Sequence, residues 1–325
     1  MNRRPVLKSL AAWAALGAFA LPARAATFPD RPLRLVVPFP PGGPADNYGR
    51  IVAAGLSAEL QQSVVVDNRP GVSGALGVQS VARAPADGYT VGLAGTGATV
   101  FLPLLTAKPL FDTFADLTFI SGVATAPNVF VVGPGVKAPD IQSFIAEARQ
   151  RPGGFSIAST GVGSSPHILA ALFQQKSGTQ LLHVPYKGAA PALQELIGGQ
   201  VDAFIGEVAG VIPFVQSGKA RALFCAADAR AKWLPQVPSA PEVGLPEVVL
   251  TGDYGLVAPA GLDAAVAQRL SAAMARVLAQ PEVQRKFDQQ FGTPDASDSA
   301  RYTAKLRSET QRWRPVIQAA NITLD

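Results

Sequence analysis

Short apolar and β-branched runs alternate with helical patterns along most of this chain. The runs lie at residues 64–66, 90–94, 129–132, 155–158, 181–184, 201–205 and 220–226. Such alternation is typical of α/β units with parallel strands. The pattern therefore predicts an α/β fold.

Three helices are predicted from apolar residues at helical spacing. The first carries Val52, Leu56 and Leu60. The second is expected to follow a capping Asp263 and to end at Pro281. The third should begin near Ser297 or Asp298 and carry on one side Tyr302, Leu306, Trp313 and Ile317. We interpret these last four side chains as core.

Two glycine-rich turns each link a predicted strand to a predicted helix. The first follows residues 33–39 and reads Pro40-Pro41-Gly42-Gly43-Pro44-Ala45-Asp46. The second follows residues 155–158 and reads Ser159-Thr160-Gly161-Val162-Gly163-Ser164-Ser165-Pro166, with Ser165 as the expected N-cap. A helix start presents unpaired N–H groups and the positive end of the helix dipole. The two turns therefore predict a small acidic ligand.

The first 25 residues have the pattern of an export signal. Arg3, Arg4 and Lys8 precede an alanine-rich apolar stretch, and Ala23-Arg24-Ala25 is a small-x-small cleavage site. A retained membrane anchor is the alternative, but the stretch is shorter than the ~20 residues that span a bilayer. The sequence predicts a periplasmic protein cleaved near Ala25, exported by either the Sec or the Tat route.

Removing this signal changes the charge and leaves a chain of two-domain size. Of 28 basic residues 24 would remain against 23 acidic ones, which reduces the net charge from +5 to +1. Nucleic-acid binding then has no compositional support. About 300 residues exceed the size of one typical core, so two domains are expected, with the proline-rich passage 234–246 as a candidate connection.

Catalytic, metal and nucleotide motifs are weak. Ser164 and Ser165 lie beside glycine, but the sequence is not the Gly-x-Ser-x-Gly of a nucleophile elbow. His167 and His183 are too few for a typical zinc site, and no phosphate loop or complete dinucleotide fingerprint occurs. Cys225, the single cysteine, lies in an apolar run and is interpreted as core. No metal and no cofactor is predicted.

Several motifs resemble the Bug-type substrate-binding proteins of tripartite tricarboxylate transporters, in the same order from about Phe28 to Asp325. They are Arg34-Leu35-Val36-Val37-Pro38-Phe39-Pro40-Pro41-Gly42-Gly43 with Asp46, Val64-Val65-Val66-Asp67-Asn68-Arg69-Pro70-Gly71, Asp87-Gly88-Tyr89-Thr90, Gly161-x-Gly163-Ser164-x-x-His167, His183-Val184-Pro185-Tyr186-Lys187-Gly188 and Gly198-Gly199-Gln200-Val201-Asp202.

This resemblance implies a type II periplasmic binding protein fold, with two α/β lobes and a ligand cleft between them. The first lobe would take residues 26–127 plus 250–325, and the second residues 128–249. The family likeness also implies ligand-binding positions, which are Phe39, Gly43, Asp46, Thr96, Thr99, Thr160, Gly163 and Ser164. For each position helix capping or turn geometry is the alternative role, and for Asp46 capping is equally well supported.

Three positions depart from the family pattern. Leu102-Pro103 replaces a common Asn-Pro, Gly206 followed by Glu207 replaces an aspartate, and Asp253 replaces a tryptophan. Carboxylates of Glu207 and Asp253 in the cleft would oppose a tricarboxylate unless a proton or cation lay between them. One hypothesis is a ligand with a carboxylate at the turns and an amine or other donor toward Asp253. The alternative is a solvated Asp253 at the cleft rim.

The expected function is therefore that of a monomeric periplasmic receptor, which binds a small carboxylate and delivers it to a membrane permease. One alternative is an exported hydrolase-like enzyme that uses Ser164, His167 or Glu207 in the same cleft. Another is a sensor lobe that signals to a membrane kinase.

Overall fold

The computed structural model describes residues 28–324, and residues 31–324 belong to one compact unit. The predicted signal at residues 1–25 and its cleavage site lie outside the described residues. Across the part that is described, no helix combines the length and apolar character needed to cross a membrane.

The first lobe is built on a mixed sheet. Strands β1 (Leu33–Val37), β2 (Val64–Asn68) and β3 (Thr90–Gly95) are parallel, and β9 (Thr251–Pro259) runs antiparallel to β3. The long strand β4 (Leu117–Val132) pairs with β9 and with the short β10 (Thr293–Pro294). The helical segments of this lobe are α2 (Pro44–Leu60), η1 (Val72–Gly74), α3 (Ala75–Ala82), η2 (Gly97–Phe101), α4 (Leu102–Leu105), α9 (Ala264–Ala279) and α10 (Pro281–Gln289).

The second lobe continues from the other half of β4. There β4 pairs with β7 (Ala203–Glu207) and β8 (Arg221–Ala226), and β7 is parallel to β5 (Ser156–Ser159), which pairs with β6 (Leu182–Pro185). Its helical segments are α5 (Ile141–Gln150), α6 (Ser165–Ser177), α7 (Ala189–Ile197), α8 (Val208–Gln216) and η3 (Pro241–Val243).

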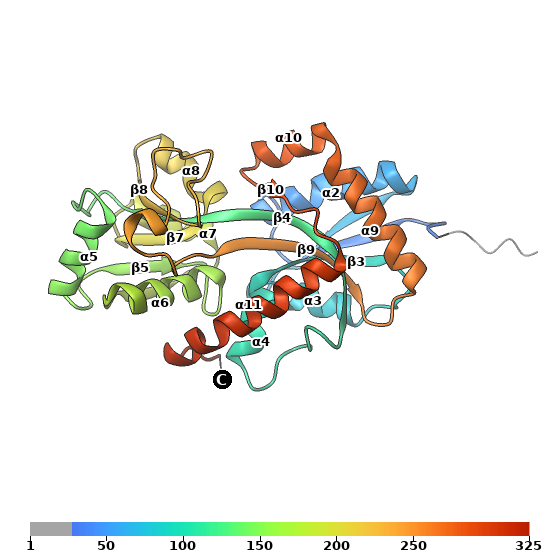
Figure 1. The fold of residues 1–325 in the computed structure, drawn as a ribbon, viewed down its shortest axis with the longest axis horizontal. Coiled ribbons are helices and arrows are strands. Elements are labelled where there is room, and N and C mark those ends of the chain that lie inside the picture. Colours follow the sequence, from blue (N-terminus) through green and yellow to red (C-terminus); the bar gives the residue numbers. More distant parts are fainter. Residues whose placement is uncertain (1–27, 325) are drawn as a thin grey trace, which may run out of the picture. The chain divides into compact units, whose positions relative to one another are not determined.

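Strand β4 changes partners in its middle. Pro127 is opposite Thr251 of β9, whereas the next residue, Asn128, is opposite Glu207 of β7 and Ala226 of β8. Figure 1 shows β4 running from one lobe to the other, with β9 beside it. One continuous strand therefore belongs to both lobes.

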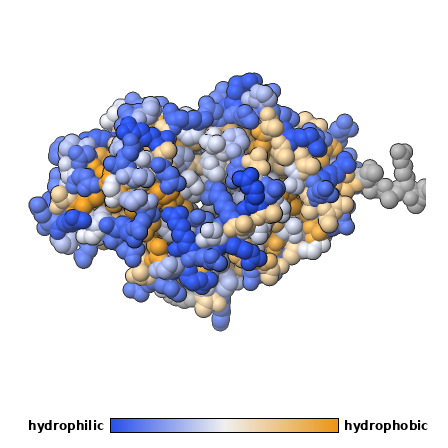
Figure 2. Space-filling view, viewed as in Figure 1, coloured by the Kyte–Doolittle hydropathy of each residue, from blue (hydrophilic) through white to orange (hydrophobic). Residues whose placement is uncertain are grey.

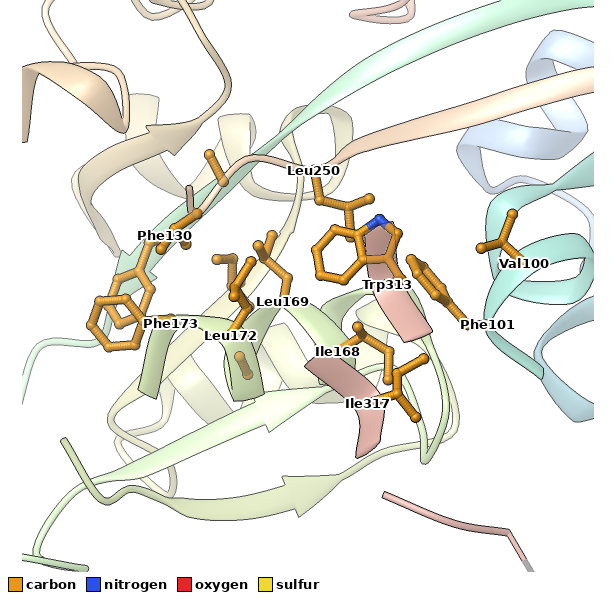
Figure 3. Packing of buried hydrophobic residues seen from close by; sticks show 14 of the residues in the cluster. Val100, Phe101, Phe130, Ile168, Leu169, Leu172, Phe173, Leu250, Trp313 and Ile317 are labelled. Atoms are coloured by element: carbon orange, nitrogen blue, oxygen red, sulfur yellow. The ribbon is translucent and has the colours of Figure 1, made fainter. Parts of the chain in front are cut away.

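Helix α11 (Ser299–Ala319) joins the hydrophobic cores of the two lobes. The indole of Trp313 packs edge-on against Phe101 of η2, with 5.4 Å between ring centroids. Figure 3 shows Leu169 and Leu250 on the other side of this indole. All four side chains belong to one buried cluster, so apolar packing holds α11 between the lobes. On the face drawn in Figure 2, hydrophilic residues cover both lobes and hydrophobic areas are interrupted.

Most predicted elements are found, with differences at their ends. Asp263 and Asp298 cap α9 and α11, and the four predicted core residues of α11 are buried. As predicted, the second helix stops at Pro281: α9 ends at Ala279, and Pro281 is the first residue of a new helix, α10, where its missing N–H costs nothing. The β4 pattern was predicted only from residue 129, because the residues before it include glycine, serine and proline.

The proline-rich passage 234–246 is packed rather than extended as a free linker. Leu234, Val237, Ala240 and Leu245 are buried, and the Cys225 N–H donates to the Pro238 carbonyl. Cys225 is also buried, as predicted for a core residue. The passage leads from β8 to β9 along the second lobe.

Candidate functional site

The carboxyl ends of the first-lobe strands bring three predicted or neighbouring site residues together. β1 and β3 are parallel in register, so Phe39 and Thr96 follow adjacent strand ends, and Tyr254 of β9 is opposite Gly95. The rings of Phe39 and Tyr254 are 6.4 Å apart at 77°. Ligands of open α/β sheets bind outside the carboxyl ends of strands, which is where these residues lie.

The carboxyl ends of the second-lobe strands β5 and β7 lie next to those of the first lobe. β5 and β7 are parallel, so Thr160 and Glu207 lie at neighbouring strand ends. The hydroxyl of Tyr254 donates to Oε1 of Glu207 over 2.7 Å. This hydrogen bond shows that the carboxyl edges of the two lobes meet.

The first glycine-rich turn leaves the start of α2 uncapped. Gly43 is the N-cap, in an extended conformation with φ −85° and ψ 171°, and no side chain caps the helix. The first N–H groups of a helix have no partner within it. The start of α2 can therefore donate to a carboxylate and stabilise its charge.

Asp46 stabilises this turn through the hydrogen bonds that its carboxylate accepts. Its buried carboxylate accepts hydrogen bonds from Gly42 N, Arg50 Nε and Asn68 Nδ2, each at 2.9 Å. Burial alone would raise the pKa of Asp46, but the bonds from Arg50, Gly42 and Asn68 outweigh it and hold this pKa below its ordinary value. The geometry thus supplies the turn-stabilising role that the sequence left open.

The second turn is capped by its own serine. Ser164, not Ser165, is the N-cap of α6: its extended backbone lets Oγ accept from His167 N at 3.4 Å while it donates to the Gly161 carbonyl at 2.7 Å. The predicted cap was therefore displaced by one residue, because Pro166 occupies the second rather than the first helical position.

Several N–H groups of this second turn are already used. Gly163 N donates to Nδ1 of His167 at 3.1 Å, and Gly161 N to Oγ of Ser159 at 3.2 Å. Within residues 28–324, the half-buried Thr160 has no hydrogen-bond partner for its hydroxyl. The sequence led us to expect backbone N–H donors on this side of the site, but the N–H groups of Gly161 and Gly163 already have partners. The hydroxyl of Thr160 is therefore a better candidate donor to a ligand.

Two histidines support the second turn from behind. His167 and His183 stack at 3.9 Å with an interplanar angle of 3°, and Nε2 of His183 is 2.7 Å from Oγ of Ser159. Burial, aided by His183, lowers the pKa of His167 to about 4, and burial also lowers that of His183. The serine whose hydroxyl contacts a histidine ring is Ser159, which is fully buried. This is a structural pair rather than an accessible nucleophile and base.

The two threonines of the loop after β3 donate to the backbone. Thr96 Oγ1 bonds the Asp253 carbonyl at 3.2 Å, and Thr99 Oγ1 bonds the Gly95 carbonyl at 3.1 Å. Both residues are buried. They fix the loop beside Tyr254.

The two unusual carboxylates have different partners. Asp253 is buried and binds Nζ of Lys305 at 2.8 Å; burial raises its pKa, and the charge of Lys305 opposes this. Glu207 has Tyr254 as its hydrogen-bond donor; burial raises its pKa to about 7, an effect that Tyr254 reduces and Asp253 increases. The charge of Asp253 is therefore balanced by Lys305 of α11, without a ligand.

Tyr254 and Lys305 were not identified from the sequence. Tyr254 could have been inferred, because alternation along a strand places it on the face opposite Asp253. Lys305 has no local signal in the sequence, since 52 residues separate it from Asp253.

Two surface hollows of about 390 and 240 Å³ lie away from this site, against β8 and between α2 and α10. No group of three or more His, Cys, Asp or Glu suited to a metal occurs among residues 28–324.

The chain is similar to proteins of a transport-receptor family over nearly its whole length. The family model of the tripartite tricarboxylate transporter family receptor matches residues 49–322. Protein BugT of Bordetella pertussis is 34% identical over 326 residues, covering 100% of both chains. The structure titled R. palustris Rpa4515 with adipate has a TM-score of 0.85 at 30% identity, covering 91% of this chain and 99% of that one. MatC from Rhodopseudomonas palustris with bound malate has a TM-score of 0.81 at 28% identity, covering 89% and 100%.

Proposed function

Because the chain belongs to the tripartite tricarboxylate transporter receptor family, we propose that it captures a small organic acid and delivers it to the membrane permease of such a transporter. Its fold is the two-lobed α/β fold of periplasmic binding proteins, as predicted. The chain is a solute-binding receptor and not an enzyme. Adipate and malate, the ligands named for two relatives, are both dicarboxylates.

The observation that carries this proposal is the uncapped start of α2 at the meeting carboxyl edges of the two lobes. One ligand carboxylate would accept N–H groups there, next to Gly43. Phe39 would pack on the ligand, and the hydroxyl of Thr160 would donate from the second lobe. Gly163 and Ser164 would shape that opposite wall. Asp46, Thr96 and Thr99 would hold the two loops in place through the hydrogen bonds described above.

The proposed lobes are residues 26–127 plus 250–325 and residues 128–249. The change of β4 partners between Pro127 and Asn128 supports this division. Ligand binding would shift an equilibrium between open and closed arrangements toward the closed one, which the permease would recognise. We propose that the receptor is a periplasmic monomer whose export signal is removed near Ala25.

A ligand screen on the chain from Ala26 onward tests the function. The melting temperature would be measured with mono-, di- and tricarboxylates, since a ligand that binds only the folded form raises it with concentration. A saturable increase with a carboxylate, and recovery of that acid unchanged, is the expected result. Conversion of the acid would contradict a role as a receptor that delivers it intact. A melting temperature unchanged by every acid would overturn the proposal.

A variant connects the screen to the site. Gly43→Asp places a carboxylate at the start of α2, where it would cap the helix and repel an anionic ligand. We expect it to fold and to lose the ligand-induced increase. Binding that survives in this variant would mean that the acid lies elsewhere.

A further inference from the structure

Glu207 is a carboxylate at the proposed ligand site that has no cation of its own. Asp46 pairs with Arg50 and Asp253 pairs with Lys305. Among the described residues no lysine, arginine or histidine lies within 4.0 Å of the Glu207 carboxylate. Of the three acids, Glu207 is thus the one left without a positive partner.

The surroundings of Glu207 hold its side chain in one place. Tyr254 donates its single proton to Oε1, and Gly252 lies so close that a Cβ there would be 2.3 Å from this oxygen. Glycine at position 252 therefore makes room for the carboxylate. Within residues 28–324, Oε2 has no hydrogen-bond donor, and the residue is only partly buried. A free acceptor oxygen remains for a ligand.

The site consequently has two unlike ends. The start of α2 offers N–H donors and a positive dipole end, and it is connected to Glu207 through Phe39 and Tyr254. Glu207 offers a negative acceptor. A second ligand carboxylate at that end would face a like charge in surroundings that already disfavour the charged form of Glu207, whose pKa burial raises to about 7.

We propose that Glu207 determines specificity by accepting a hydrogen bond from an amine of the ligand, so that the receptor prefers amino acids over plain dicarboxylates. This inference rests on the proposed function, because it assigns the second end of the same site. A charge-assisted bond to a fixed, partly dehydrated carboxylate is stronger than a neutral one. The ammonium would also supply the positive partner that Glu207 lacks.

Three ligands that differ only at the far end test this preference. Pentanoate, 4-aminobutyrate and glutarate share a carboxylate and three methylene groups, and at the far end they carry a methyl group, an ammonium and a carboxylate, respectively. Dissociation constants would be measured by calorimetry for these acids and for the corresponding sets one carbon shorter and longer. We expect the amine member of the best-fitting set to bind at least about tenfold more tightly than the other two.

Glu207→Gln separates specificity from folding. Glutamine has nearly the same shape and can still accept from Tyr254, so the fold should persist. The variant should bind the amine at least about tenfold more weakly and the dicarboxylate more tightly. Glu247→Gln is the matched control: it removes one carboxylate that is 64% exposed and bound to Lys176, and it should leave the ranking unchanged.

The outcomes distinguish this inference from the proposed function. If glutarate or a homologue binds more tightly than its amine counterpart, or if Glu207→Gln keeps the amine preference, the inference is overturned while the carboxylate receptor stands. If no acid of any length binds, both are overturned. An amine preference that Glu207→Gln removes supports both.

Discussion

Tyr254 and Glu207 are 47 residues apart in the chain, yet a 2.7 Å hydrogen bond joins the Tyr254 hydroxyl to Oε1 of Glu207. Tyr254 lies on β9 and Glu207 at the carboxyl end of β7. The bond therefore connects β9, which lies between β3 and β4 in the first-lobe sheet, to β7, which ends at the second-lobe wall. It keeps a buried tyrosine hydroxyl paired, but it also holds a carboxylate where solvation is poor.

Glu207→Gln should change the pH dependence of stability. Burial raises the pKa of Glu207 from 4.5 to about 7, so its native-state protonation favours folding below pH 4.5, and this advantage is lost as pH rises through 7. The variant avoids that loss. We expect its melting temperature to exceed that of the wild type by about 2–4 °C at pH 8 and to match it at pH 4.5. Equal melting temperatures at both pH values would contradict the raised pKa.

Gly43→Ser should raise stability and weaken ligand binding. The extended backbone at position 43 suits an N-cap residue, and a Cβ there would lie 3.9 Å from the nearest atom, the Pro40 carbonyl oxygen. A serine cap gains a few tenths of a kcal/mol over glycine. Its hydroxyl would take N–H groups that the ligand needs, so carboxylate affinity should fall at least about tenfold. Gly43→Ala, which adds the Cβ without a cap, is the control and should affect binding less.

Asp253→Asn should lower stability. The substitution leaves Lys305, whose side chain is 34% exposed, with the more distant Asp295 at 3.5 Å. Losing one partner of a buried ion pair costs ~3–5 kcal/mol, and partial exposure of Lys305 reduces the expected loss of unfolding free energy to about 1–2 kcal/mol. Chemical denaturation would measure it.

The same variant also tests whether Asp253 contacts ligand. Because Lys305 already occupies its carboxylate, we expect ligand affinity to change by less than about threefold, well below the effect of losing a charged hydrogen bond. A larger loss of affinity would restore the direct role that the sequence suggested. Combining Asp253→Asn with Lys305→Met should cost less than the sum of the two single changes.

His167→Asn should make the protein less sensitive to acid. Nδ1 of His167 accepts from Gly163 N, which requires a neutral ring, and burial together with His183 lowers its pKa from 6.5 to about 4. Because this pKa is lowered on folding, the stabilisation is complete above pH 6.5 and is lost as pH falls through 4. Asparagine can accept the same bond without titrating. Between pH 6.5 and 4 its melting temperature should fall by about 2–4 °C less than that of the wild type. Parallel curves would indicate that His183 alone titrates.

Local sequence was sufficient for much of the α/β architecture. Strand-forming runs, the capping residues Asp263 and Asp298 and the buried face of α11 depend on neighbours within a few residues. The same is true of the glycine turn that leaves α2 uncapped. The long strand β4 was only partly predicted, because its first residues are ordered by partners on β9 rather than by their own propensities.

The family and its two-lobed fold could be predicted from ordered motifs, and these also placed the turns near a ligand. They could not decide what each polar side chain contacts. From the sequence, Asp46 and Asp253 are both acids near a binding site. In the structure, the carboxylate of Asp46 accepts three hydrogen bonds from its own lobe, and the charge of Asp253 is balanced by Lys305.

The sequence by itself determined where helices start and which turns can receive an anion, because backbone conformation and capping act over a few residues. Only the tertiary structure decided which charges remain unpaired there. The partners of Glu207 and Asp253 come from other elements, and pairing across the fold depends on register and packing that no local pattern encodes.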